Sequence, residues 1–111
     1  MNKKIIDKIL KFRNDRNWKQ FHTPKDLAIS ISLESAELLE NFQWSGQDLI
    51  CKKKKDQIAE ELADIMIYCI LMAESCNLDI NDIIEKKIAI NNKKYPVSKS
   101  KGNAKKYTDL K

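Results

Sequence analysis

The nine residues 65–73, IMIYCILMA, carry no charged side chain over more than two helical turns. A helix that is apolar all round has to be covered on every side. The chain has only 111 residues, so it provides few companion helices for this purpose. We therefore expect an oligomer in which helices of a second chain complete the core.

The scarcity of glycine and proline, two of each, favours long helices over a turn-rich β fold. Apolar residues recur at helical spacing and predict helices at residues 2–15, 23–43, 56–76 and 79–95. Thr23 is the expected N-cap of the second helix, and Pro24 its first residue. The predicted fold class is all-α, a four-helix-type bundle completed by oligomerisation.

The charge distribution divides the chain into a near-neutral domain, residues 1–96, and a flexible basic tail, residues 97–111. Residues 93–111 hold seven lysines and one aspartate, a net charge of +6, whereas residues 1–92 have a net charge of −1. A basic tail can attract nucleic acid or nucleotide phosphates, and it can equally be a solvated segment that keeps the protein soluble.

Several classes of protein are disfavoured by the sequence. No run of 18 apolar residues is present, so no membrane span is expected. The first ten residues, MNKKIIDKIL, are too polar for a signal peptide. Cys51, Cys69 and Cys76 lack metal-binding or redox spacing and fit reduced thiols, which indicates a cytoplasmic protein.

Two apolar helices each carry a pair of carboxylates three residues apart, Glu34 with Glu37 and Glu61 with Asp64. Residues at this spacing share one face of a helix. Two like charges about 4 Å apart repel by roughly 4 kcal/mol at an effective dielectric of about 20. A hard divalent cation such as Mg²⁺ would neutralise four converging carboxylates, and facing helices of a bundle can present them to it.

Spacing alone leaves one other interpretation of these acids open and disfavours a second. The carboxylates can be exposed and pair with lysines, as single Glu-x-x-Glu motifs usually do. A di-iron centre is disfavoured, because such centres use Glu-x-x-His motifs and the only histidine, His22, lies outside both acidic helices.

The acid motifs and several further segments together resemble the MazG-like nucleoside triphosphate pyrophosphohydrolases, within them the dCTP pyrophosphatase branch. The similarity covers most of the chain. The segments that carry it are RNDRNWKQFHTPKDLA (13–28), ESAELLENFQW (34–44), EELADIMIY (60–68), NNKKYP (91–96) and KGNAKKYTDL (101–110).

The resemblance implies a Mg²⁺-dependent enzyme, with Mn²⁺ as a substitute, that hydrolyses a nucleoside triphosphate to the monophosphate and pyrophosphate. It implies a homodimer or homotetramer without a membrane or stable nucleic-acid partner. Glu34, Glu37, Glu61 and Asp64 are the implied metal ligands, and Glu37 with Glu34 the implied catalytic residues. Glu60 lies outside the signature.

The resemblance implies a house-cleaning enzyme that acts on dCTP-like or modified deoxynucleotides. It also indicates which residues would bind the nucleotide. The implied nucleobase pocket consists of Trp18, Phe21, His22 and Trp44, and Tyr68 is expected near the sugar. Because no Walker-type phosphate loop is present, phosphate recognition is expected to rest on metals and cations. Lys87 and Asn91 match family positions and are the candidates for phosphate or sugar contacts, with Lys94 as a further candidate.

Three alternative functions follow from the sequence. A related all-α phosphohydrolase can act on another nucleotide, dUTP or phosphoribosyl-ATP. A helical nucleic-acid-binding module would use the lysine-rich tail and need no metal, but it leaves the paired acids unexplained. A purely structural dimerisation domain leaves them unexplained as well.

Overall fold

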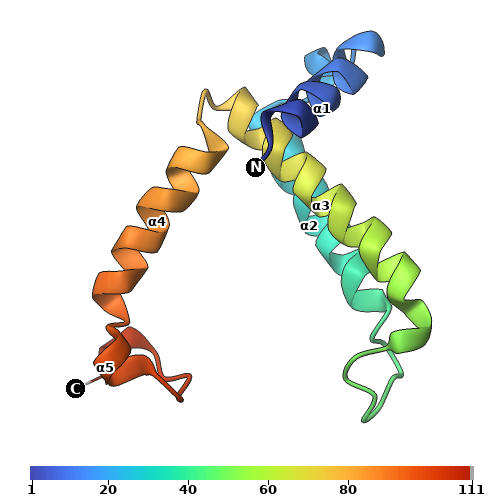
Figure 1. The fold of residues 1–111 in the computed structure, drawn as a ribbon. Helices are drawn as coiled ribbons and strands as arrows, with labels where there is room; N and C mark the ends of the chain where they lie inside the picture. Colours follow the sequence, from blue (N-terminus) through green and yellow to red (C-terminus); the bar gives the residue numbers. More distant parts are fainter. Residues whose placement is uncertain (111) are drawn as a thin grey trace. The chain divides into compact units, whose positions relative to one another are not determined.

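The structure is a computed structural model and describes residues 1–110. It is helical, with no strand in this range, which confirms the predicted all-α class (Figure 1). The α-helices are α1 Lys3–Asp15, α2 Pro24–Glu40, α3 Lys55–Ser75, α4 Ile80–Lys94 and α5 Val97–Ser100. Three 3₁₀ turns accompany them, η1 Lys19–Phe21, η2 Lys52–Lys54 and η3 Tyr107–Asp109.

The four long helices begin and end close to the predicted positions, except at the end of α2. This helix stops at Glu40, three residues early, and residues 41–44 form turns that lead to Trp44 at φ 66°. The predicted N-cap is confirmed, because the Thr23 hydroxyl accepts a hydrogen bond from the Asp26 amide at 3.2 Å. Pro24 occupies the first helical position, where its missing N–H costs no hydrogen bond.

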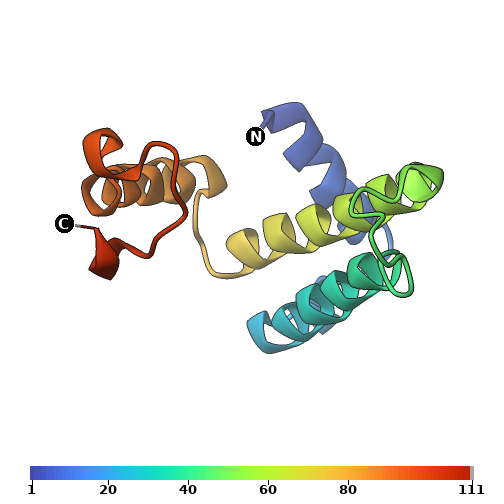
Figure 2. The same ribbon diagram turned by 90° about the horizontal axis from the view of Figure 1, so that it is seen from below.

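The chain divides into two compact units, residues 1–78 and residues 79–111. In the first unit α2 and α3 lie side by side and antiparallel, and α1 packs on α3 (Figures 1 and 2). The second unit contains α4, α5 and η3. The predicted division at residue 96 and the completion of a bundle by a second chain both stay predictions.

The core of the first unit is small. Its buried apolar side chains are Leu27 of α2, Cys51 of the connecting loop, and Ile70, Leu71 and Ala73 of α3. Within the described part of the chain, no helix is long and apolar enough to cross a membrane.

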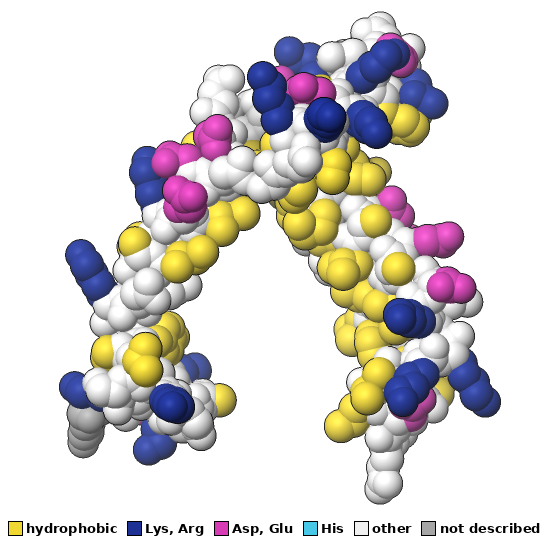
Figure 3. Space-filling view, in the orientation of Figure 1, with side chains coloured by type: hydrophobic (Ala, Val, Ile, Leu, Met, Phe, Trp, Pro, Cys, Tyr) yellow, Lys and Arg dark blue, Asp and Glu magenta, His cyan; other side chains and the backbone are white. Residues whose placement is uncertain are grey.

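Large apolar side chains remain exposed along the α2–α3 pair. Leu39 is 70% exposed, and further examples are Ile29, Leu33, Leu62, Met66 and Ile67. Figure 3 shows apolar side chains running along one face of these helices. The apolar segment at residues 65–73 is therefore covered only towards its C-terminal half, because Met66 and Ile67 are open to solvent.

A buried ion pair joins α1 to α3. Arg13 is only 4% exposed, and its Nη1 donates to the Glu74 carboxylate at 2.5 Å. Its Nε donates to Asn14 Oδ1 at 3.0 Å. A guanidinium taken out of water depends on such partners, so this contact anchors the end of α1.

Glu74→Gln is expected to destabilise the fold by about 2 kcal/mol. Breaking a buried pair costs about 3–5 kcal/mol, and the cost is smaller here because Glu74 is one-third exposed. The free energy of unfolding in urea measures the effect. Asp15→Asn is the matched control, since it breaks the exposed Lys11–Asp15 pair and should cost under about 1 kcal/mol. Equal losses in the two variants would contradict an anchoring role for Arg13.

Candidate functional site

The four paired acids lie on the neighbouring helices α2 and α3, near enough for the charges of the other three to act on Glu34. Glu34 is half-buried, and its Oε2 atom is buried without a hydrogen-bond partner among the described residues. The pKa of Glu34 is raised, first by burial, then by hydrogen bonding to Glu37, and then by the negative charges of Glu37, Asp64 and Glu61. Both helices therefore contribute carboxylates to one electrostatic cluster, which we call the carboxylate cluster.

Glu61 has a further partner that the sequence interpretation missed. The Nδ2 atom of Asn41, just after the end of α2, donates to Glu61 Oε2. Position 41 lies four residues after Glu37 and seven after Glu34, so it continues the same helical face. A polar residue at this spacing was the signal that could have identified it.

The donor set of the cluster fits Mg²⁺, although the carboxylates do not form a closed ligand cage. Across residues 1–110, no three His, Cys, Asp or Glu side chains are arranged as ligands of a single ion. Mg²⁺ nevertheless prefers carboxylate oxygen and is commonly held by a few carboxylates together with water and substrate phosphates. The buried Oε2 of Glu34 lacks a partner that a cation would supply, and a cation would offset the repulsion that raises the pKa of this carboxyl.

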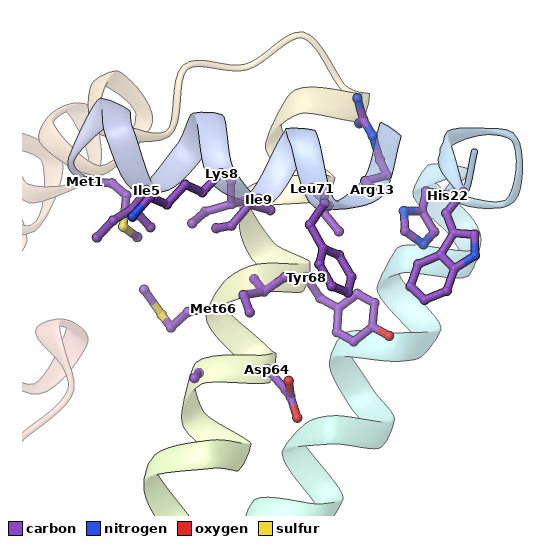
Figure 4. A pocket seen from close by; sticks show the side chains of 15 residues that line it. Met1, Ile5, Lys8, Ile9, Arg13, His22, Asp64, Met66, Tyr68 and Leu71 are labelled. Atoms are coloured by element: carbon purple, nitrogen blue, oxygen red, sulfur yellow. The ribbon is translucent and has the colours of Figure 1, made fainter. Parts of the chain in front are cut away.

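A cavity of about 720 Å³ lies beside the cluster and is lined by α1, by α3, and by Trp18 and His22, which flank η1. Asp64 lines it, so the cavity adjoins the cluster directly (Figure 4). Its other polar or aromatic lining residues include Trp18, His22 and Tyr68, and its apolar wall includes Ile5, Ile9, Phe12, Met66 and Leu71. Asp64 and Tyr68 project from the same side of α3, one turn apart (Figure 4).

A chain of edge-to-face ring contacts forms one end of the cavity. The ring centroids are 5.7 Å apart for Phe12 and Trp18, 6.4 Å for Trp18 and His22, and 6.5 Å for His22 and Tyr68. Such contacts stabilise the orientation of the rings. The structure thus brings together Trp18, His22 and Tyr68, three of the residues proposed from sequence to contact the nucleoside.

The remaining predicted substrate residues are not among those that line the cavity. Phe21 and Trp44 are exposed, Trp44 to 92%, and neither lines the cavity. Lys87, Asn91 and Lys94 belong to the second unit. Lys94 Nζ lies 4.8 Å from the centroid of the Tyr107 ring.

His22 is held in an environment that disfavours its charged form. Its Nδ1 atom is buried and has no hydrogen-bond partner within residues 1–110. Burial lowers the pKa of His22, and the positive charge of Arg13 lowers it further. A neutral imidazole beside Trp18 is suited to stacking and neutral hydrogen bonding rather than to an ionic contact.

Acidification is expected to destabilise the protein through His22. Because the pKa of His22 is lower in the folded than in the unfolded protein, the unfolded state binds the proton first as pH falls below about 6.5. The free energy of unfolding should therefore fall between pH 7 and pH 5, as measured in urea. In His22→Gln this part of the decline should be absent. The same pH dependence in the variant would contradict the assignment.

Comparison with known proteins gives a matching family, relatives that share one name, and a solved structure of similar fold. The MazG-like family matches residues 29–110. dCTP pyrophosphatase 1 of Mus musculus is 38% identical over 104 residues, which cover 89% of this chain and 61% of that protein. The Homo sapiens protein of the same name is 33% identical over the same number of residues. This chain thus spans about three-fifths of the length of these relatives.

A solved structure has a similar fold. The crystal structure of a pyrophosphatase from Archaeoglobus fulgidus superposes with a TM-score of 0.78 at 37% sequence identity. The match covers 85% of this chain and 91% of that one. The similarity therefore extends over most of both chains.

Proposed function

The chain belongs to the MazG-like family, and we propose that it hydrolyses a nucleoside triphosphate to the monophosphate and pyrophosphate. The observation that carries the proposal is the carboxylate cluster of Glu34, Glu37, Glu61 and Asp64 beside an aromatic cavity. The similarity to dCTP pyrophosphatase 1 supports a dCTP-like or modified deoxynucleotide as the substrate. The proposed role is house-cleaning of the nucleotide pool.

Magnesium is the proposed cofactor, with Mn²⁺ as a substitute, and the carboxylate cluster would hold it. When bound, the metal neutralises triphosphate charge and lowers the pKa of a coordinated water. The orphaned oxygen of Glu34 and the all-oxygen donor set support this choice over a soft or nitrogen-preferring metal.

The proposed reaction breaks the bond between the α-phosphorus and the oxygen that bridges to the β-phosphorus. Water oxygen forms a new bond to the α-phosphorus, pyrophosphate leaves with the bridging oxygen, and the water proton passes to a carboxylate. We assign Glu37 as the proton acceptor. Glu37 is solvent-exposed, so water can approach it, and its charge is among those that raise the pKa of the neighbouring Glu34.

The cavity is the proposed site of the nucleoside. Trp18 and His22 would hold the base by stacking and by hydrogen bonding, and Tyr68, one turn from Asp64, would face the sugar. In this arrangement the triphosphate would lie next to the carboxylate cluster. Phe21 and Trp44 do not line this cavity and stay proposed for the nucleobase pocket on the family resemblance alone. Lys87, Asn91 and Lys94 likewise stay proposed for phosphate or sugar contacts.

The proposed assembly is a homodimer or homotetramer. The exposed apolar side chains of α2 and α3 support it, because a monomer would leave this face in water. A second copy would also give Trp44 a covering surface. The three free cysteines support a cytoplasmic location.

A substrate panel tests the proposed function. Purified protein is incubated with each dNTP and NTP in Mg²⁺ or in EDTA, and pyrophosphate and monophosphate are quantified together. The expected result is equimolar release of both, dependent on the metal and fastest with dCTP-like nucleotides. Absence of turnover for every nucleotide at high enzyme concentration would overturn the proposal.

A further inference from the structure

We infer that Asn41 is a positioning residue, which holds the Glu61 carboxylate in place for a divalent cation. The inference rests on the proposed function, since it concerns the same cluster. Asn41 is only 7% exposed, although asparagine is usually a surface residue. A buried amide has to satisfy its hydrogen bonds, and those of Asn41 connect the end of α2 to a carboxylate of α3.

Both hydrogens of the Asn41 amide are used. Nδ2 donates to Glu61 Oε2 and to the backbone carbonyls of Leu38 at 3.2 Å and Glu37 at 3.4 Å. The reversed orientation would put the amide oxygen against both the carboxylate and these carbonyls, which are all acceptors. The surroundings therefore fix which way the amide points.

The backbone at Asn41 is also held from the other side. The Cys51 Sγ donates to the Asn41 carbonyl at 3.3 Å, and Cys51 is itself buried. The Cys51 amide donates to Asp48 Oδ1 at 3.1 Å, so Cys51 is also bonded within the loop. The loop between α2 and α3 thus fixes the position from which the amide reaches Glu61.

This contact has a direct consequence for cation binding. Asn41 engages Oε2 of Glu61 and adds no charge to a cluster that is already strongly negative. It limits the rotation of the carboxylate, so less conformational entropy is lost when a cation binds. Partners of ligating carboxylates typically contribute 10- to 100-fold in metal affinity.

The test compares Asn41→Leu, which removes the amide at similar size, with Asn41→Gln, which keeps it on a longer side chain. Binding of Mn²⁺ alone to the full-length protein is titrated by electron paramagnetic resonance. We expect about 10- to 100-fold weaker binding in Asn41→Leu and a smaller loss in Asn41→Gln. Gln43→Leu, which removes an exposed amide two residues away, is the matched control and should bind as the unaltered protein does.

The outcomes distinguish an Asn41 that positions Glu61 from an Asn41 that only ends α2. They also distinguish failure of this inference from failure of the proposed function. Thermal midpoints in EDTA show whether each variant is folded. Unchanged Mn²⁺ affinity in folded Asn41→Leu would overturn the inference, even if the midpoint fell. Lack of Mn²⁺ binding by the unaltered protein would instead overturn the metal site of the proposed function, and the inference with it.

Discussion

Glu37→Gln is expected to lower kcat for pyrophosphate release by about 10²- to 10⁴-fold, the usual contribution of a general base. Glutamine has nearly the same size as glutamate but cannot accept the water proton and is a weaker ligand for Mg²⁺. The cluster would also lose one of the charges that raise the pKa of Glu34. Initial rates of pyrophosphate and monophosphate release at saturating substrate and Mg²⁺ measure the effect.

Glu60→Gln is the matched control for this variant. Glu60 is an exposed glutamate next to Glu61, and it is not among the charges that act on Glu34. Its replacement should leave kcat within about twofold, because an exposed charge outside the site is strongly screened. A folded Glu37→Gln protein with unchanged kcat would show that Glu37 is not the proton acceptor.

Leu27→Ala is expected to reduce the free energy of unfolding by about 2–5 kcal/mol, the range for deleting a buried leucine. Leu27 is 1% exposed and lies on α2, which packs along α3. A cavity at this position would loosen the contact that brings the carboxylates of the two helices together. Urea unfolding at fixed protein concentration measures the change, since the proposed assembly would make stability depend on concentration.

Leu27→Met tests whether the lost side-chain volume causes the destabilisation expected for Leu27→Ala. Methionine nearly conserves the volume of leucine, so this variant should cost under about 1.5 kcal/mol. Equal destabilisation by alanine and methionine would contradict the expected packing role.

The helices were predictable from sequence because their signals are local. Apolar spacing located α1 to α4, and Thr23-Pro24 marked the start of α2 through a cap that depends on residues three apart. The short helix α5 and the turn η3 in the basic tail were missed. Each contains four residues or fewer, which is too short for apolar periodicity to register.

The carboxylate cluster was partly predictable for a similar reason. Three-residue spacing places Glu34 beside Glu37 and Glu61 beside Asp64 on their own helices, but only the antiparallel packing of α2 on α3 brings the pairs together. The buried partners Arg13 and Asn41 looked like ordinary polar residues. Their roles depend on Glu74 and Glu61, which are far away in the sequence.

The exposed aromatic residues are where the family resemblance and the single chain differ. Trp44 and Phe21 were assigned to the nucleobase pocket by family resemblance, but they lie outside the cavity of the single chain. Light scattering at micromolar concentration addresses the proposed assembly. A mass of two or four times 12.9 kDa would support it, whereas 12.9 kDa would contradict it.

Hydrolysis of dCTP in ¹⁸O-labelled water tests directly whether water attacks the α-phosphorus. The products formed with Mg²⁺ are analysed by ³¹P nuclear magnetic resonance and mass spectrometry, with an EDTA sample alongside. Attack of water on the α-phosphorus predicts that the label appears in dCMP, that pyrophosphate is unlabelled and that EDTA abolishes both products. Label in pyrophosphate, or formation of dCDP and inorganic phosphate, would contradict the account.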